Sequence, residues 1–279
     1  MLQNEGKLAS SSGIPIFYRE WKPEREETKA VICLVHGMGE HSGRYEHVAE
    51  QMTGNGLAVL ALDQQGHGRS GGKRGHIHSL QSAISDVAAL IQEAERLYAD
   101  RPVFLYGHSM GGNIVLNCVL RLKPRLQGVI VSSPWLKLAF EPPAVKRWLG
   151  QIASRVMPKL QQQTGLIASD LFRPGYDKAP AIEGDPLNHT CITAGTYFSV
   201  LAGGEWALSH AAERLQVPML LLHGTDDRVT SYRASVLLAE RLGESCTWLS
   251  WNGGYHELHN DTDGEQVITS IMEWVNRNM

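Results

Sequence analysis

Short apolar runs alternate with longer amphipathic segments over most of the chain. The runs typical of strands are Ala30–Val35, Leu57–Leu62, Val103–Tyr106, Gly128–Val131, Met219–His223 and Cys246–Leu249. The segments with helical spacing are Tyr45–Thr53, Leu80–Tyr98, Met110–Leu122, Tyr232–Leu242 and a last one from about Gly264 to Arg277. This alternation is typical of βαβ units. It predicts an α/β fold with a mostly parallel sheet flanked by helices.

A stretch of different texture, residues 134–205, interrupts this pattern. It is rich in proline and has no strand-like repeat. Proline removes a backbone donor and ends regular elements, so the stretch does not continue the sheet. We therefore expect an inserted helical cap at 134–205 on a core formed by residues 1–133 and 206–279.

One amphipathic helix is predicted within this cap. Its apolar residues recur at helical spacing, and they are Val145, Trp148, Leu149, Ile152 and Val156. The basic residues fall largely elsewhere on the helix, and they are Lys146, Arg147, Arg155 and Lys159. Two interpretations remain open. The helix is a lid whose apolar face meets a membrane or micelle or lines an acyl pocket, or it is an ordinary helix packed on the core.

The composition excludes several classes of partner. The chain has 279 residues, 43% of them hydrophobic, which is enough to bury a large core. Its net charge is -3, from 26 basic and 29 acidic residues, so no excess positive field exists for a nucleic acid. The first residues, MLQNEGKLASSSG, lack the zones of a secretory signal. We expect a cytoplasmic protein that binds no nucleic acid, with peripheral membrane contact through the cap as the alternative location.

We expect neither a metal site nor a cofactor. The four cysteines lie far apart, and the histidine pairs His76/His78 and His256/His259 lack the partners of a known metal motif. Residues 66–71 match G-x-G-x-x-G, the pattern of dinucleotide-binding loops. The segment RGHIHS separates these glycines from the next helix, so no helix N-terminus is placed to hold a pyrophosphate. We interpret residues 66–71 as an ordinary loop.

The candidate chemistry begins at Ser109. It is the centre of a G-x-S-x-G pentapeptide that lies between a predicted strand and a predicted helix. A sharp strand-to-helix turn needs small residues on both sides of the serine, and it raises the hydroxyl above the sheet. The following helix points its N-terminal N–H groups toward developing negative charge. Ser109 is therefore a candidate nucleophile.

A serine nucleophile needs a base, and the base needs an orienting acid. The run MLLLHGTDDRV ends a strand and supplies Asp226 and Asp227, and TWLSWNGGYH ends another and supplies His256. Neighbouring residues leaving a strand point in different directions, so only one aspartate reaches the imidazole. The pattern of apolar residues alone leaves open which one. The chain order serine, acid, histidine is that of α/β-hydrolases.

Acyl transfer also needs two N–H donors for the oxyanion. One is expected from the backbone of Met110, directly after the nucleophile. The other is expected from the loop His36-Gly37-Met38-Gly39, which follows the strand Ala30–Val35. We predict that Met38 supplies it.

These residues resemble the monoacylglycerol lipase and lysophospholipase group of α/β-hydrolases, which is classed with the serine aminopeptidase S33-like hydrolases. The matching segments are HGMGEHSGRY (36–45), DQQGHGRSGGKRGHI (63–77), GHSMGG (107–112), DPL (185–187), HGTDDRV (223–229) and YHELHND (255–261). The resemblance covers nearly the whole chain, and the cap matches loosely. It implies an α/β-hydrolase fold with an inserted helical cap.

The resemblance also implies residue roles. The family's acid is the fourth residue of G-x-x-D, which is Asp227 here. Arg44, His108 and His259 match positions that border the polar end of the family's pocket. The animal monoacylglycerol lipases carry a tyrosine three residues before the D-P of the cap, where this chain has Ile182. A polar contact to glycerol is therefore expected to be absent.

The expected function is that of a serine hydrolase acting on lipid esters, most of all monoacylglycerols or lysophospholipids, through an acyl-enzyme on Ser109. The partner is then a small lipid ester, and the sequence does not specify an oligomeric state. Two alternatives stay open within enzymes, a broad-specificity carboxylesterase and a thioesterase. A third is a ligand-binding protein that keeps the fold without turnover, because fold does not dictate function.

Overall fold

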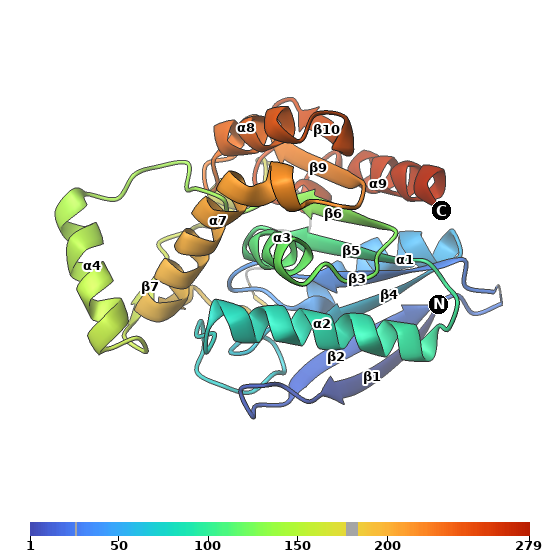
Figure 1. Cartoon of the computed structure of the whole chain (residues 1–279), viewed down its shortest axis with the longest axis horizontal. Helices are drawn as coiled ribbons and strands as arrows, with labels where there is room; N and C mark the ends of the chain where they lie inside the picture. The colour runs from blue at the N-terminus through green and yellow to red at the C-terminus, as the bar shows by residue number, and fades with distance from the viewer. Residues whose placement is uncertain (26, 177–183) are drawn as a thin grey trace.

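One large sheet runs through the protein, with helices on both of its faces (Figure 1). This computed structural model describes residues 1–25, 27–176 and 184–279. The strands, in the spatial order β1-β2-β4-β3-β5-β6-β9-β10, are Leu2–Leu8 (β1), Ile16–Lys22 (β2), Leu57–Leu62 (β4), Ala30–Val35 (β3), Val103–His108 (β5), Gly128–Ser132 (β6), Met219–Gly224 (β9) and Cys246–Trp251 (β10). From β4 to β10 all neighbouring pairs in this sheet are parallel, whereas the pairs β1–β2 and β2–β4 are antiparallel. The predicted fold class is thus confirmed.

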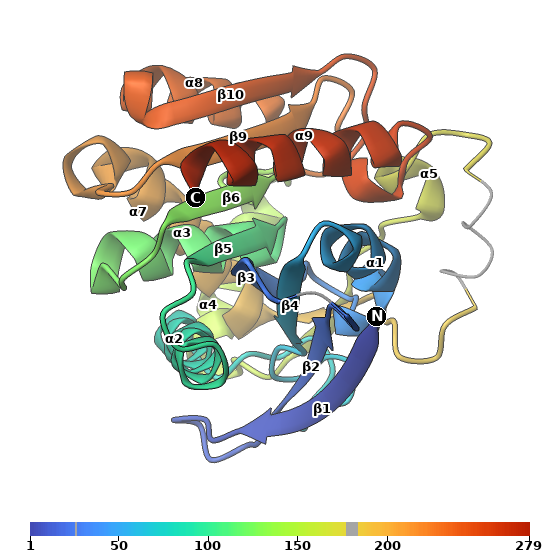
Figure 2. The same ribbon diagram turned by 90° about the vertical axis from the view of Figure 1, so that its right-hand side faces the viewer.

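The helices form a layer on each face of this sheet, as the end view in Figure 2 shows. Helices α1 (Glu46–Gly54) and α9 (Gly264–Asn278) cover one face, and α2 (Leu80–Leu97), α3 (Met110–Leu122), α7 (Ala194–Arg214) and α8 (Tyr232–Leu242) cover the other. Strand side chains alternate between the two layers, which is why β3 reads as a continuous apolar run. Ile32 and Leu34 pack toward α1, whereas Val31, Cys33 and Val35 pack toward α2 and α3.

The core elements lie close to their predicted bounds. The strands β3 and β4 and the helices α3 and α8 coincide with the predicted ranges. Helix α2 begins after Ser79, whose hydroxyl accepts from the N–H of Ser82 as an N-cap should. A 3-10 helix, Ser42–Tyr45, precedes α1.

The hairpin β1–β2 at the edge of the sheet was not predicted. Most of β1 is exposed and carries few apolar residues, so it has no clear alternation. Strand β2 is largely buried, yet its sequence IFYREWK interrupts the apolar run with charged residues. One of them, Glu20, is buried because its carboxylate accepts hydrogen bonds from Tyr98 and Asn4. Buried charge with partners is a tertiary feature that local patterning does not reveal.

The segment between β6 and β9 carries the predicted helix and two unexpected strands. It contains α4 (Ala144–Val156), β7 (Gln161–Gln163), α5 (Ala168–Leu171) and β8 (Cys191–Thr193). Strands β7 and β8 pair antiparallel and correct the expectation of a segment without strands. Three residues are too few to show a period of two. Helix α7 runs past residue 205, so the boundary expected between 205 and 206 falls inside a helix that packs on α3.

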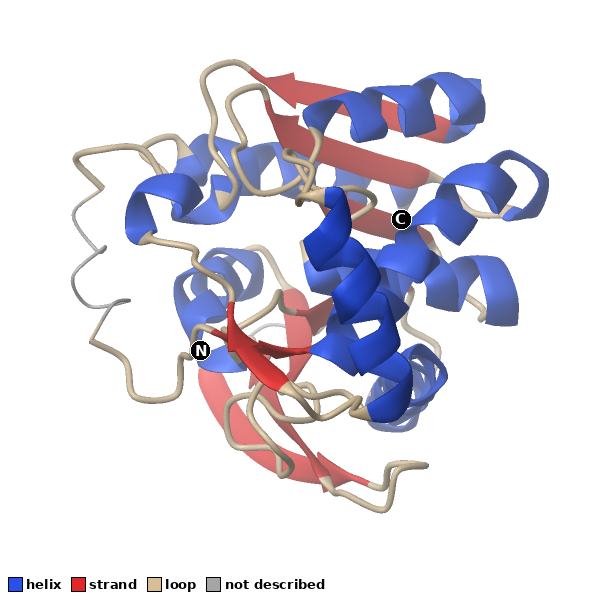
Figure 3. Ribbon diagram, turned by 90° about the vertical axis from the view of Figure 1, so that its left-hand side faces the viewer, coloured by secondary structure: helices blue, strands red, loops and turns tan. Residues whose placement is uncertain are grey.

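Helix α4 stands at the periphery of the molecule (Figures 1 and 3). None of its residues is buried. The apolar side chains of Trp148 and Leu149 are 62% and 54% exposed, and Ile152 is 44% exposed. The interpretation of α4 as an ordinary helix packed on the core through this apolar face is therefore wrong.

Candidate active site

Ser109 occupies a strained turn between β5 and α3. Its φ is +54°, a conformation that side chains rarely adopt. The turn is crowded on both sides, because a Cβ added at Gly107 would lie 2.6 Å from the carbonyl oxygen of Gly111, and one added at Gly111 would lie 2.2 Å from that of Val35. The N–H of Ser109 donates to the carbonyl of Ser132 on β6. The turn therefore holds the serine above the carboxyl end of the sheet.

The structure brings Ser109, His256 and Asp227 into one hydrogen-bonded chain. Ser109 Oγ lies 2.9 Å from His256 Nε2, and His256 Nδ1 lies 2.8 Å from Asp227 Oδ2. All three residues are buried or nearly so. The three side chains come from loops after β5, β9 and β10, which all end at the same edge of the sheet. This is the geometry in which an imidazole takes a proton from a hydroxyl while a carboxylate orients it.

The two neighbouring aspartates have different surroundings. Asp226 is exposed and accepts from the hydroxyl of Thr225. Asp227 is buried, and its Oδ1 accepts from the N–H groups of Val229 and Thr230 at 2.7 and 2.9 Å. Of these two aspartates, only Asp227 contacts the imidazole of His256.

The pairing of charges between His256 and Asp227 sets the pKa values of both groups. Burial alone would lower the pKa of His256, but the charge of Asp227 and its hydrogen bond outweigh burial and raise it. Burial would raise the pKa of Asp227, but the charge of His256 and hydrogen bonds from His223 and His256 hold it well below its usual range. The carboxylate is thus ionised and stabilises an imidazolium.

The two residues predicted to supply oxyanion donors follow residues of the serine turn or of the loop against it: Met110 follows Ser109, and Met38 follows Gly37. Met110 is the first residue of α3, and neither its N–H nor that of Met38 donates to another group in the described part of the chain. The loop of Met38 lies against the nucleophile, since a Cβ added at Gly37 would be 3.1 Å from Ser109 Cβ. Glu40 accepts a short hydrogen bond from the Gly37 N–H, which fixes the start of this loop.

Arg44 lies in the cavity wall between two carboxylates. It donates to Glu257 from both terminal nitrogens, at 3.2 and 2.5 Å, and lies 3.3 Å from Glu40. Burial would raise the pKa of Glu257, but Arg44 outweighs it and lowers the pKa. For Glu40, burial dominates and raises the pKa. Carboxylates within the protein thus balance the positive charge of the Arg44 guanidinium.

His108 and His259 occupy different places. His108 lines the cavity and lies 4.9 Å from the His256 ring, between ring centroids. Burial and the charge of His256 lower the pKa of His108 to about 3, so it is neutral. His259 is not among the cavity-lining residues; it is stacked on Tyr45 at 4.7 Å and meets His108 edge to face at 5.0 Å. The structure thus places His108 at the pocket and His259 behind it.

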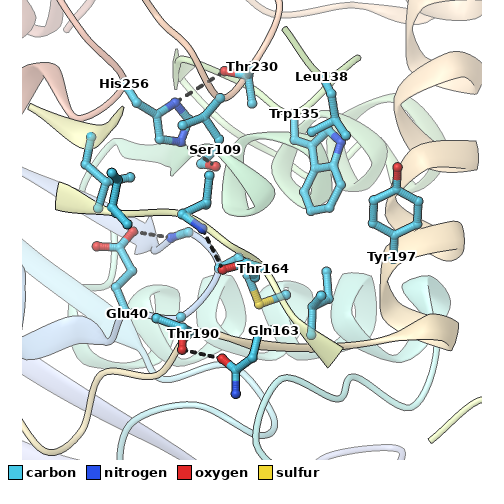
Figure 4. Close-up of a pocket in the computed structure, with 18 of the residues that line it drawn as sticks. Glu40, Ser109, Trp135, Leu138, Gln163, Thr164, Thr190, Tyr197, Thr230 and His256 are labelled. Carbon is cyan, nitrogen blue, oxygen red and sulfur yellow. Dashed lines mark hydrogen bonds between the residues drawn. The ribbon is translucent and has the colours of Figure 1, made fainter. Parts of the chain in front are cut away.

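A cavity of about 660 Å³ opens above Ser109. Figure 4 shows Ser109 and His256 facing each other, with Trp135, Leu138 and Tyr197 on one side of the space. Further apolar walls come from Phe140, Leu166, Ile167, Leu171, Phe172, Ile192 and Phe198. The cap segment supplies most of this wall, and from α4 it supplies Lys146, Arg147 and Gly150 rather than the exposed apolar face. Polar side chains line the cavity as well, and the group that includes the Arg44 ion pairs, here called the polar end, consists of Glu40, Arg44, His108, Asp185 and Glu257.

Ile182, the position at which a polar contact to glycerol is expected to be absent, lies outside the described residues. Over residues 1–25, 27–176 and 184–279, no group of three or more His, Cys, Asp or Glu residues is placed to hold a metal ion. No helix in these ranges is long and apolar enough to cross a membrane.

Sequence reasoning missed two polar residues at this site. His223 is a fully buried residue of β9 whose Nε2 lies 2.9 Å from Asp227 Oδ2. Glu257, next after His256, pairs with Arg44 across 213 positions of sequence. The signal for His223 was present, because a histidine ending the apolar run MLLLH is unusual in a buried strand.

The parallel sheet, the strained serine turn and the serine, histidine and aspartate at one sheet edge define an enzyme of the α/β-hydrolase class. The chain belongs to the family described as serine aminopeptidase, S33, whose sequence profile matches residues 26–263. The resemblance inferred from the motifs is thereby confirmed.

Several known proteins are similar to this chain over almost its whole length. An abhydrolase domain-containing protein of Dictyostelium discoideum is 34% identical over 99% of this chain, which spans 29% of that longer protein. The monoacylglycerol lipase of Mycolicibacterium smegmatis is 30% identical over 98% of this chain and 97% of its own length. The crystal structure of the Paleococcus ferrophilus monoacylglycerol lipase is 33% identical, with a TM-score of 0.83 over 100% of both chains.

Proposed function

We propose that the protein hydrolyses carboxylic esters of fatty acids through an acyl-enzyme on Ser109, and that monoacylglycerols are its principal substrates. The observation that carries this proposal is the Ser109–His256–Asp227 chain at the base of a largely apolar cavity. An apolar cavity accepts an acyl chain, and the hydrogen-bonded chain supplies an activated nucleophile beside it.

The reaction follows from these positions. His256 takes the proton of Ser109 as Oγ attacks the ester carbonyl, and Asp227 stabilises the imidazolium. The N–H groups of Met38 and Met110 hold the oxyanion. His256 then protonates the departing alcohol. Water, activated by the same imidazole, hydrolyses the acyl-enzyme and regenerates the serine.

The charges at the polar end support an uncharged head group. A phosphate-bearing head group needs a free cation nearby. Arg44, the cation of this group, is already shared by Glu40 and Glu257, and Asp185 adds a further carboxylate to the wall. The other two cations that line the cavity, Lys146 and Arg147, come from α4 in the cap. A glycerol hydroxyl needs only donors and acceptors. The names of the similar lipases support the same substrate class.

A substrate panel tests this proposal. With one acyl chain throughout, we expect kcat/KM for monoacylglycerol to exceed that for lysophosphatidic acid by at least tenfold, because the two differ only by the phosphate. Each added CH2 is expected to raise kcat/KM about three- to fourfold until the cavity is full, in line with about 0.8 kcal/mol per buried CH2. A flat profile over chain length would favour a broad-specificity carboxylesterase, and faster thioester cleavage would favour a thioesterase.

We propose further that the segment 134–205 is a cap whose helix α4 docks on lipid surfaces, making the protein peripheral to membranes. Two features support this. The apolar side chains of α4 are exposed, and the helix carries Lys146, Arg147 and Arg155 but no acidic residue. Such a helix lies in the interface of a bilayer with its apolar face buried and its cations near anionic head groups.

Replacing Trp148, Leu149 and Ile152 together by serine tests the docking face. We expect binding to anionic vesicles to be lost and turnover of vesicle-bound monoacylglycerol to fall about tenfold or more, because burial of large apolar side chains drives interfacial binding. Vesicle sedimentation and a paired assay on a short, soluble ester measure the two effects. The matched control is Leu122→Ser, which removes an exposed leucine of α3. Unchanged vesicle binding in the triple variant would exclude α4 as the docking face.

A further inference from the structure

His223 is a polar residue in an otherwise apolar strand. It is fully buried near the carboxyl end of β9, after three consecutive leucines. Hydrogen-bond partners stabilise a buried imidazole, since an unpaired polar group in the interior is costly, and His223 has a partner on each ring nitrogen. The partners of His223 therefore indicate what the residue does.

One nitrogen of His223 is bound to the acid of the candidate site. Its Nε2 lies 2.9 Å from Asp227 Oδ2, the same oxygen that contacts His256 Nδ1 at 2.8 Å. The Thr230 hydroxyl lies 2.8 Å from this oxygen as well. Oδ1 is occupied by two backbone N–H groups, so the carboxylate is held on every side.

The other nitrogen fixes the tautomer. His223 Nδ1 lies 2.7 Å from the hydroxyl of Ser235 on α8, which is itself fully buried. A carboxylate only accepts, so the proton of a neutral His223 lies on Nε2. Nδ1 then accepts from the Ser235 hydroxyl. The imidazole is thus a permanent donor to Asp227.

We propose that His223 is a positioning residue that clamps Asp227 and tunes the basicity of His256. It holds Oδ2 at the point where His256 Nδ1–H meets it. It also withdraws part of the negative charge that Asp227 presents to His256, since a donor stabilises the ionised carboxylate. This inference rests on the proposed roles of Asp227 and His256.

Loss of the His223 hydrogen bond is expected to raise the pKa of His256. Without this donor, the Asp227 carboxylate becomes more basic and stabilises the imidazolium more strongly. The base must be neutral to accept the serine proton, so the acid limb of kcat/KM moves to higher pH. The other titratable groups facing His256 are Glu257, Glu40 and His108, with Arg44 behind them, and those facing His223 are Asp227, His256 and Tyr232. None of these is changed by substitution at 223.

His223→Leu and His223→Gln form the decisive pair. Leucine removes the donor, whereas the glutamine amide can present an N–H near the position of Nε2. We expect His223→Leu to move the acid limb upward by about one pH unit and to lower the plateau of kcat/KM about tenfold, because the freed carboxylate rotates. His223→Gln should recover most of both effects. The limb position does not depend on how much enzyme is folded, and fluorophosphonate titration of Ser109 gives the active concentration.

Two further measurements separate positioning from packing. Leu221→Val creates a small cavity on the same buried strand, so it should lower Tm and leave the acid limb in place. Nitrogen-15 NMR of histidine-labelled protein should show His223 protonated at Nε2 and not at Nδ1. An unchanged acid limb in His223→Leu, or an Nδ1–H tautomer, would overturn the inference. If the wild-type enzyme had no ester turnover, the proposed function itself would fail instead.

Discussion

Ester turnover is expected to fall by about 10⁴- to 10⁶-fold when Ser109 is replaced by alanine. The hydroxyl is the only group removed, and its oxygen is the atom that forms the bond to the acyl carbon in the proposed mechanism. Loss of a serine nucleophile elsewhere has effects of this size, while oxyanion donors and substrate binding sustain a small residual rate. The measurement is kcat/KM on a monoacylglycerol, with labelling by a fluorophosphonate probe as a second readout.

The chain offers a matched control in Ser133→Ala. Ser133 is fully buried and, like Ser109, has a positive φ, +45°; its hydroxyl has no hydrogen-bond partner in the described ranges. Its substitution removes one buried serine hydroxyl from the same edge of the sheet, so we expect near wild-type turnover and labelling. Substantial ester turnover in Ser109→Ala, with labelling retained at another residue, would exclude the proposed nucleophile.

Asp227→Asn is expected to cost about 10⁴-fold in kcat, because an amide cannot replace a carboxylate that only accepts. Oδ1 and Oδ2 of Asp227 face five donors in total: two backbone N–H groups, two imidazoles and the Thr230 hydroxyl. Whichever way the asparagine amide turns, its NH2 group meets donors. His256 then loses either its acceptor or its fixed tautomer.

Asp226→Asn is the paired control for this change. Asp226 is exposed and contacts Thr225 rather than His256, so we expect its turnover to stay within about twofold of the wild type. Both variants are compared at one pH on the same ester. A larger loss in Asp226→Asn than in Asp227→Asn would assign the acid to the other residue.

An element or a contact could be predicted from the sequence where the interactions that determine it are local, and escaped prediction where they join distant residues. The bounds of α3 are local, because the elbow glycines start the helix and Pro124 follows its end, so the pattern predicts them. The choice between Asp226 and Asp227 is partly local: strand patterning alone left it open, and the spacing of the family motif pointed to the buried one. Strand β2 pairs with β4 and its buried Glu20 accepts from Tyr98, so both depend on partners far along the chain and escaped local reasoning.

The cap illustrates a second limit. The amphipathic pattern correctly predicted α4, but it could not tell which surface the apolar face would meet. Hydrophobic spacing gives the direction of a face relative to its own helix axis, not relative to the rest of the fold. The ion pair between Arg44 and Glu257 could not be predicted from local patterning either, because it joins residues 213 positions apart.

The order of the strands has a consequence for biosynthesis. Ser109 follows β5 near the middle of the chain, whereas Asp227 and His256 follow β9 and β10, which are added at one edge of the sheet after β6. A ribosome-bound nascent chain that ends before β9 therefore carries the serine turn without its base. The proposed enzyme gains acyl-transfer chemistry only when the segment that carries β9, β10 and His256 has emerged, and until then the growing polypeptide cleaves no lipid ester.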